Sequence, residues 1–148
     1  MEKITVYTDG STIGNGKEDS ACGWACKLMW NGNVLVKSGS DIGRTNNQME
    51  MKAVLEAMRS ITKKSIPVEV YSDSKYVVEM LNGKYWMRKN QGLWHNLLTE
   101  KAKFKDIKFI WVKGHDKDQH NNEVDKLAAE ESQKAAEKIQ KRRGDDHC

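Results

Sequence analysis

The sequence predicts an α/β fold built on a mixed five-stranded sheet. Two observations predict it. The first third of the chain alternates polar and apolar residues with the two-residue period of strands, and the rest alternates short β-branched runs with stretches of helical period. Strands joined by short turns are expected to pair antiparallel, whereas strand–helix–strand units imply parallel pairing.

Three antiparallel strands are expected to open the chain. Polar and apolar side chains alternate over residues 4–9, and this first strand is expected to end at Asp9, before a long polar turn. Two further runs, 23–30 and 33–38, are joined by Asn31-Gly32, a pair typical of tight hairpins.

The period changes at Asn47, where apolar residues begin to recur at helical spacing. This pattern continues to Ile61 and predicts an amphipathic helix packed on the sheet, with Pro67 marking a stop shortly after it. The remaining elements are expected to be strands at 68–73 and 107–112 and helices at 74–81, 93–105 and from 124 onward.

Composition limits the class of protein and its partners. The chain has 148 residues, with 25 Lys+Arg against 21 Asp+Glu, and this basic balance favours an acidic partner. No stretch approaches the ~20 apolar residues that span a bilayer, and no secretion signal is recognisable, so a cytoplasmic protein without membrane contact is expected. Three cysteines without a CxxC pair indicate neither a disulfide framework nor a zinc cluster, and a monomer is expected.

Four carboxylates stand where the predicted elements begin or end: Asp9, Glu50, Asp73 and Asp125. Each has a structural explanation by itself. Asn47 and Asn122 are plausible helix N-caps with an acid three residues later, as in a capping box, and Asp73 can cap the helix that follows it.

Taken together, the four carboxylates indicate a metal site. Parallel pairing of the first and fourth strands would place Asp9 and Asp73 at the same edge of the sheet. Close carboxylates repel each other unless a cation neutralises them, and oxygen ligands without Cys or clustered His favour Mg²⁺ or Mn²⁺ over Zn²⁺. Two such ions ~4 Å apart can activate a water and stabilise the leaving oxygen of a displacement at phosphorus.

Five short segments follow one another with regular spacing over residues 1–130. They are YTDGS from Tyr7, TNNQME from Thr45, YSDSKYV from Tyr71, WVKGH from Trp111 and NNEVDKLA from Asn121. Together they resemble the five motif blocks of type 1 ribonuclease H, the bacterial-type ribonuclease HI. The resemblance implies a ribonuclease H-like fold and an endonuclease that hydrolyses the RNA strand of an RNA/DNA hybrid with two Mg²⁺ ions, for which Mn²⁺ is a possible substitute.

The resemblance also implies roles for single residues. Asp9, Glu50, Asp73 and Asp125 match the metal-binding carboxylates of the family. His115 matches a loop histidine to which the family assigns proton transfer or product release, and the Gly-His pair ten residues before Asp125 selects it over His120. Without the resemblance, His115 is an ordinary histidine in a solvated loop.

Substrate contacts are implied next to the first and second motif blocks. The implied residues are Gly10, Ser11, Thr12, Asn15, Thr45, Asn46 and Asn47, with Thr45 and Asn46 expected to hold a phosphate of the DNA strand. Turn chemistry explains the same residues equally well, because tight turns favour Gly and Asn.

The sequence departs from the family pattern in two places. Lys75 follows Asp73-Ser74 where bacterial members often have Gln, and it is a candidate substrate contact. The long basic handle of many members looks deleted, because only residues 82–92 separate the second helix from the third.

This short link still has a composition suited to nucleic acid, since cations alternate with aromatic residues in it. Its candidate contacts are Lys84, Trp86, Arg88 and Lys89, although its aromatic side chains also suit packing against the third helix. Residues 1–130 are expected to form the ribonuclease H domain, and residues 131–148 the end of the last helix and a basic, partly disordered tail that partly compensates for the lost handle.

Two other functions fit the same fold. One is a non-catalytic nucleic-acid-binding module, which has no need to gather four carboxylates beside a phosphate backbone. The other is a different nuclease or strand transferase of the same superfamily, including a reverse-transcriptase domain. Metal-dependent cleavage separates the first alternative from the enzyme, and the His115 and Asn46-Asn47 motifs favour the hybrid nuclease over the second.

Overall fold

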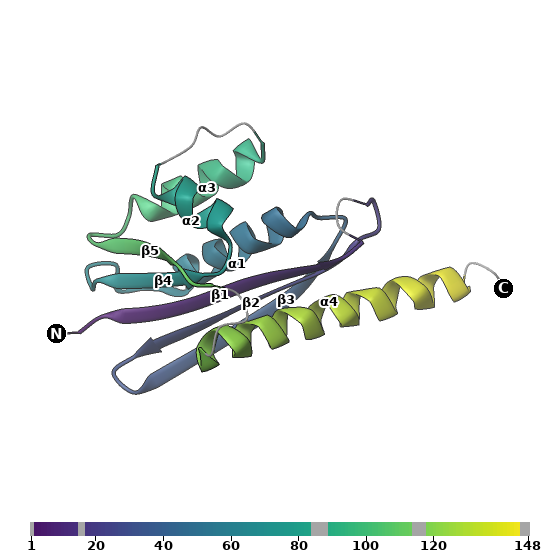
Figure 1. Cartoon of the computed structure of the whole chain (residues 1–148), viewed down its shortest axis with the longest axis horizontal. Coiled ribbons are helices and arrows are strands. Elements are labelled where there is room, and N and C mark those ends of the chain that lie inside the picture. Colours follow the sequence, from purple (N-terminus) through teal and green to yellow (C-terminus); the bar gives the residue numbers. More distant parts are fainter. Residues whose placement is uncertain (1, 15–16, 84–88, 114–117, 146–148) are drawn as a thin grey trace.

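A computed structural model describes residues 2–14, 17–83, 89–113 and 118–145 of the chain. Five strands form one sheet in the order β3-β2-β1-β4-β5 (Figure 1). The strands are β1 (Ile4–Ile13), β2 (Ala21–Trp30), β3 (Asn33–Ile42), β4 (Val68–Ser72) and β5 (Ile107–Trp111). β1–β2 and β2–β3 pair antiparallel, while β1–β4 and β4–β5 pair parallel, which confirms the predicted mixed sheet.

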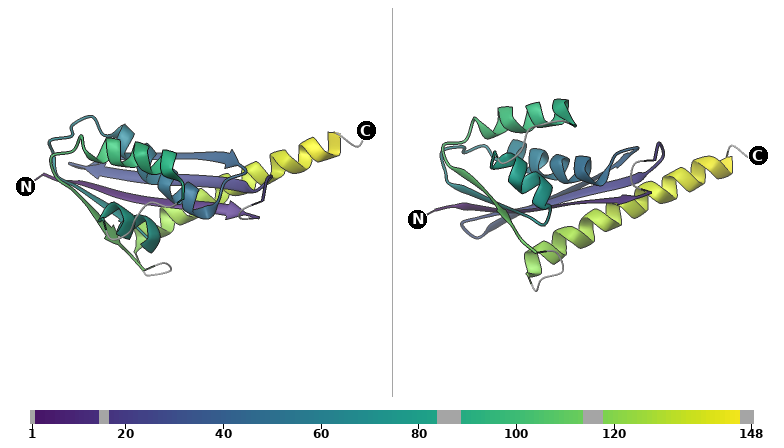
Figure 2. Two further views of the ribbon diagram at one scale, coloured as in Figure 1. Left: turned by 90° about the horizontal axis from the view of Figure 1, so that it is seen from above. Right: turned by 45° about the horizontal axis from the view of Figure 1, so that its top comes forward.

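Helices cover both faces of the sheet (Figure 2). They are α1 (Asn46–Ser60), α2 (Lys75–Leu81), α3 (Gln91–Lys101) and α4 (Gln119–Asp145). Helix α1 packs on β1 and β2 from one side and carries α3 on its outer surface, and α4 crosses β1, β2 and β3 on the other side. None of the helices in the described part of the chain is long and apolar enough to cross a membrane.

Alternation along β1 divides the core between the two faces. Val6 belongs to the large apolar cluster under α1, and its neighbour Tyr7 packs with Val124 and Ala128 of α4. A Cβ at Gly23 of β2 would overlap the backbone of Ala128, so this glycine permits the close approach of α4 to the sheet.

The opening strands are longer than the sequence predicts. β1 passes through Asp9 and continues to Ile13, because β2 pairs with it along the whole length up to Ile13↔Ala21. β2 begins at Ala21 rather than at residue 23, and β3 continues to Ile42 rather than ending at residue 38. The predicted strand end at Asp9 is therefore wrong, since an antiparallel neighbour supplies backbone partners to the polar residues that follow it.

The N-caps predicted for α1, α2 and α4 are also wrong. Thr45 rather than Asn47 caps α1, because Gln48 completes a capping box with it: the Gln48 N–H donates to Thr45 Oγ1 over 3.1 Å, and Gln48 Oε1 accepts from the Thr45 N–H over 2.9 Å. Ser74 rather than Asp73 caps α2.

Helix α4 begins at Gln119, before the predicted cap at Asn122, because Asp118 Oδ1 accepts hydrogen bonds from two backbone amides of the first turn. The helix then runs without a break past residue 130, so the expected division of the chain there stays a prediction. Helix α3 spans Gln91–Lys101, where the sequence predicts a helix over 93–105.

Candidate active site

Three carboxylates meet at the edge of the sheet where β4 ends. One oxygen from each of Asp9, Glu50 and Asp73 lies within 4.8 Å of the others. Asp9 and Glu50 are each only 3% exposed, and Asp73 is half-buried. The register explains two of these positions: Thr8 pairs with Ser72 in the parallel β1–β4 ladder, so the next residue on each chain is an aspartate. The predicted convergence of Asp9 and Asp73 is confirmed.

Glu50 reaches the cluster because α1 lies directly on β1. The backbone N–H of Gly10 donates to Glu50 Oε1 over 2.9 Å. A Cβ at position 10 would stand 2.5 Å from the Glu50 nitrogen and 2.6 Å from the Met49 carbonyl carbon, distances that real Cβ atoms do not reach. Gly10 is therefore required where it stands, and it lies inside β1 rather than in a turn.

Asp73 is held through its backbone by the neighbouring strand. The indole N–H of Trp111, the last residue of β5, donates to the carbonyl oxygen of Asp73 over 3.1 Å. The Val112 N–H donates to the carbonyl oxygen of Ser72 over 2.9 Å. These bonds extend the β4–β5 pairing to the point where the Asp73 carboxylate leaves the sheet.

Asp125 approaches the cluster from the other face of the sheet. Its side chain is exposed on α4, and it is not among the three carboxylates that lie within 4.8 Å of one another. Its proximity nevertheless contributes to the raised pKa values of Asp9 and Glu50, so it lies near the group. The four predicted carboxylates thus comprise a close group of three and a fourth at its border.

Two oxygens of the cluster are buried without a hydrogen-bond donor in the described part of the chain. Burial, followed by the proximity of Glu50, raises the pKa of Asp9, and burial also raises the pKa of Glu50. Asp9 Oδ2 and Glu50 Oε2 are buried, and no donor in the described part of the chain bonds to either. Buried anionic oxygens that lack donors fit a divalent cation, because hard oxygen ligands are those that Mg²⁺ and Mn²⁺ prefer.

The predicted substrate contacts lie in different elements, and several of them fall outside the described part of the chain. Ser11 and Thr12 lie in β1, and the Ser11 hydroxyl bonds to the Ser132 hydroxyl of α4 over 3.2 Å. Asn46 and Asn47 are exposed in the first turn of α1, directly after the Thr45 cap. The predicted residues outside the described part of the chain are Asn15, Lys84, Trp86, Arg88 and His115.

Two of the predicted substrate contacts are exposed lysines, one at the start of α2 and one just before α3. Lys75 begins α2, and its side chain is 68% exposed with its Nζ 5.9 Å from the ring centroid of Trp111. Lys89 is exposed just before α3. No local pattern indicates Trp111 as the neighbour of Asp73, because only the β4–β5 pairing brings the two together.

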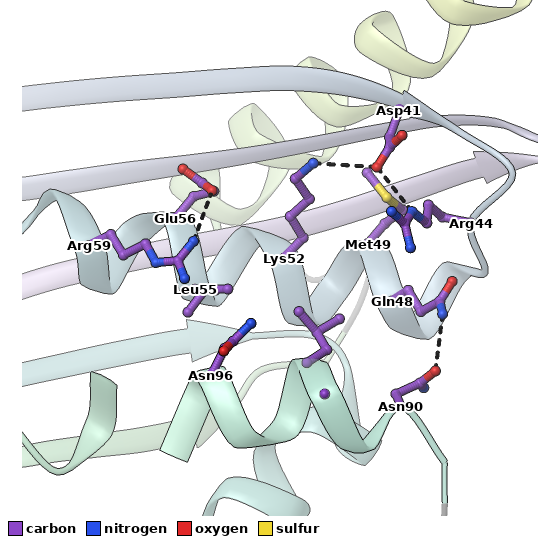
Figure 3. Close-up of a pocket in the computed structure, with 12 residues that line it drawn as sticks. Asp41, Arg44, Gln48, Met49, Lys52, Leu55, Glu56, Arg59, Asn90 and Asn96 are labelled. Carbon is purple, nitrogen blue, oxygen red and sulfur yellow. Dashed lines mark hydrogen bonds and ion pairs between the residues drawn. The ribbon is translucent and has the colours of Figure 1, made fainter. Parts of the chain in front are cut away.

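A polar cavity of about 550 Å³ lies between α1 and α3 (Figure 3). Gln48, already part of the α1 cap, donates through its Nε2 to Asn90 Oδ1 over 3.1 Å, and this bond joins the starts of the two helices. Asn90 has the left-handed φ of 59°, which an asparagine tolerates better than most residues. Asn90 is not among the residues predicted to cap a helix or to line a site, although an asparagine shortly before an apolar run is a possible helix start.

The cations that line this cavity are already partnered. Arg44 and Lys52 contact Asp41 Oδ2 over 3.2 and 3.4 Å (Figure 3). Arg59 lies 3.9 Å from Glu56 on the same helix. Three cations and two acids line the cavity, and none of the three clustered carboxylates does.

Comparisons with known proteins agree on one family. The family model of RNase H matches residues 1–133. A ribonuclease H of Clostridium botulinum is 38% identical over 144 residues, which cover 88% of this chain and 95% of that protein. A ribonuclease H of Rickettsia canadensis is 37% identical over 150 residues, covering 93% of this chain and 94% of the relative.

Solved structures show the same fold at lower sequence identity. The N-terminal RNase H domain of a Mycobacterium tuberculosis protein superposes with a TM-score of 0.82 at 21% identity, covering 94% of this chain and 99% of the other. LC11-RNase H1, solved in complex with an RNA/DNA hybrid, superposes with a TM-score of 0.76 at 23% identity, covering 90% and 99%. Because the family model matches residues 1–133 and the two relatives are 37–38% identical over most of the chain, the chain belongs to the ribonuclease H family, whose members are divalent-metal-dependent nucleases.

Proposed function

We propose that this ribonuclease H hydrolyses the RNA strand of RNA/DNA hybrids with two divalent metal ions bound at the edge of the sheet. The proposed ligands are Asp9, Glu50, Asp73 and Asp125. The observation that carries this proposal is the group of three carboxylates within 4.8 Å of one another, two of them with buried oxygens that no donor among the described residues reaches. Such a group is unfavourable in a protein without a cation.

Divalent ions in such a site supply a nucleophilic water and stabilise the charge on the leaving oxygen. The chain's own contribution is to hold the carboxylates in position before the substrate arrives. Asp9 is fixed by its pairing with Ala25 of β2, directly after the last β1–β4 pair. The Gly10 amide holds Glu50, and the Trp111 indole holds Asp73 through its backbone. Rigid elements hold a metal site more accurately than loops do.

We place the substrate across the edge that presents the carboxylates. Exposed Asn46 and Asn47 at the start of α1 stand beside Glu50, and Lys75 at the start of α2 stands beside Asp73. Amides and a cation on either side of the cluster suit contacts to sugar and phosphate, which orient a nucleic acid without reading its sequence. The hybrid bound to LC11-RNase H1, a protein of the same fold, supports this choice of substrate.

A non-catalytic binding module is disfavoured by the same electrostatics. Buried carboxylates repel a phosphate backbone, so a module that only binds nucleic acid gains nothing from Asp9 and Glu50. The family membership supports the enzyme as well.

The direct test offers a labelled RNA/DNA hybrid, duplex RNA, duplex DNA and single-stranded RNA to the purified chain with Mg²⁺, with Mn²⁺ and with a chelator. We expect metal-dependent cutting of the RNA strand in the hybrid alone. Binding of the hybrid without cutting in either metal would overturn the proposal in favour of the binding module. The preferred metal, a monomeric state and a cytoplasmic location stay predictions, as does the contribution of His115.

A further inference from the structure

We propose that Tyr7 is a positioning residue for the active site, because its phenol fixes the start of α4 to the strand that carries Asp9. Helix α4 carries Asp125, so this link sets the separation between two of the proposed metal ligands. The inference rests on the proposed role of Asp125 and extends it to a residue that is not itself a ligand.

Tyr7 stands in a row of side chains next to the carboxylates. It precedes Asp9 by two residues on β1, so both side chains leave the strand on the same face. Its partner in the parallel ladder is Tyr71, which precedes Asp73 by two residues in the same way. The two tyrosine rings stack with centroids 4.9 Å apart and planes 13° from parallel.

The phenol of Tyr7 reaches across to α4. Its hydroxyl donates to Asp118 Oδ2 over 3.0 Å. The other oxygen of Asp118 accepts from the backbone amides of His120 and Asn121 over 2.9 and 3.3 Å, which caps α4. One carboxylate therefore binds the strand through one oxygen and the helix start through the other.

The phenol stays a donor over the ordinary range of pH. Burial, followed by the hydrogen bond to Asp118, raises the pKa of Tyr7 above its usual value of 10. Tyr7 itself is only 8% exposed, so water competes poorly for this bond.

A second link holds the next turn of α4 to β2. Lys27, whose side chain is 11% exposed, contacts Glu123 Oε2 over 2.6 Å and His120 Nδ1 over 3.1 Å. The His120 ring lies 5.2 Å from the Tyr7 ring, so both links act on the same part of the helix. The side chain of Asp125 is exposed, so its position relative to Asp9 depends on how α4 is held against the sheet.

Tyr7→Phe tests the proposal in the full chain, because it removes the hydroxyl and keeps the ring. Tyr71→Phe is the matched control: it makes the same change in the stacked neighbour, whose hydroxyl donates to Glu69 of β4 over 2.8 Å. Two quantities are measured: amide hydrogen exchange at His120 and Asn121, and the Mg²⁺ concentration for half-maximal cleavage of a hybrid.

We expect Tyr7→Phe to raise both the exchange rate and the half-maximal Mg²⁺ concentration roughly three- to tenfold, the effect of one lost hydrogen bond. The KM for the hybrid should not change, and Tyr71→Phe should match the wild type in both measurements. Wild-type exchange and metal dependence in Tyr7→Phe would overturn the inference, and so would an equal effect of Tyr71→Phe.

Two further variants keep the test decisive. Asp118→Ser keeps one side-chain oxygen that can cap the helix and removes the second oxygen, which accepts from Tyr7, so combining it with Tyr7→Phe should add little to either single change. If the effects of the two changes simply add in the double variant, a direct link between the two side chains is contradicted.

Asp125→Asn separates the two proposals. Turnover at the wild-type rate in this variant would overturn both the proposed ligand and this inference. If Asp125→Asn is inactive but Tyr7→Phe behaves like the wild type, this inference alone is overturned.

Discussion

The amide of Gly10 and the carboxylate of Glu50 are joined by a hydrogen bond of 2.9 Å inside the carboxylate cluster. This bond connects β1 to α1 at the place where their backbones come closest. It leaves the second Glu50 oxygen without a donor in the described part of the chain, and so available to a cation. Close packing of a strand on a helix start is thus part of the site itself.

Gly10→Ala should impair both stability and turnover. The added Cβ would lie 2.5 Å from the Glu50 nitrogen, so α1 must move away from β1 and take Glu50 with it. We expect a loss of about 1–3 kcal/mol in the free energy of unfolding, as for other overpacked sites. Thermal unfolding and hybrid cleavage measure the two effects. Gly92→Ala is the control, because a Cβ there meets nothing within 4 Å, and a wild-type Gly10→Ala would contradict the packing argument.

Asp9→Asn should abolish turnover and leave the fold intact. The substitution keeps the shape of the side chain and removes one buried negative charge from the cluster. In the presence of a chelator the variant should unfold at a higher temperature than the wild type, since the repulsion with Glu50 is gone. Asp106→Asn, a change at an exposed aspartate, serves as the control. Hybrid cleavage at the wild-type rate would remove Asp9 from the site.

The metal-free protein should lose stability as pH rises towards neutral. Burial raises the pKa of Asp9 and of Glu50, so the folded state binds more protons than the unfolded state above their ordinary values of 3.8 and 4.5. The free energy of unfolding then falls with rising pH, by about 1.4 kcal/mol for each unit of pKa difference that is titrated.

Magnesium should reverse this trend, because the cation replaces the protons. Unfolding temperatures measured at about pH 5 and about pH 8, with chelator and with Mg²⁺, test both statements. The Mg²⁺-induced rise should be larger at the higher pH. A stabilisation by Mg²⁺ that is equal at both values would show that the ion binds elsewhere.

Lys75→Gln should weaken hybrid binding without changing the metal requirement. The Lys75 side chain is 68% exposed next to the carboxylate cluster, where a cation meets a phosphate at little desolvation cost. Loss of one phosphate contact lowers the salt dependence of log K by about 0.9. Fluorescence anisotropy with a hybrid at several salt concentrations, in chelator, measures it. The control is Lys63→Gln, a change at an exposed lysine beyond the C-terminal end of α1, and equal slopes for both variants would exclude a specific contact at Lys75.

His115→Ala should slow turnover without abolishing it. The metal ions provide most of the charge stabilisation in a two-metal displacement, so a group that transfers a proton or assists product release is helpful rather than essential. Steady-state and single-turnover cleavage measure which of these steps is slowed. Complete loss of cleavage in a folded variant would contradict this prediction.

The sequence was sufficient to predict the sheet and the carboxylates, because both depend on local periodicity and on parallel pairing. The edge shared by Asp9 and Asp73 followed from one assumption about strand order, which the register Thr8↔Ser72 confirms. The match of motif blocks supplied Glu50, whose position depends on how α1 packs.

What could not be predicted depends on partners that are distant in sequence. The polar residues after Asp9 are typical of a turn, and only the pairing with β2 makes them a strand. The caps depend on which of several nearby polar residues finds a reciprocal bond, as Thr45 does with Gln48. The Tyr7–Asp118 bond joins residues 111 positions apart, and no local pattern indicates it.

The length of β1 beyond Asp9 has a consequence for how the protein tolerates change. Strand pairing continues for four residues after Asp9, up to Ile13↔Ala21, before the chain enters the β1–β2 connection. A hydrogen-bonded ladder separates that connection from the Asp9 carboxylate, so an insertion can lengthen the connection without shifting Asp9. The exposed residues Lys17 and Glu18, beyond the predicted substrate contact Asn15, are therefore a suitable place in that connection to graft a foreign peptide, such as an affinity tag or an additional hybrid-binding segment, into a working enzyme.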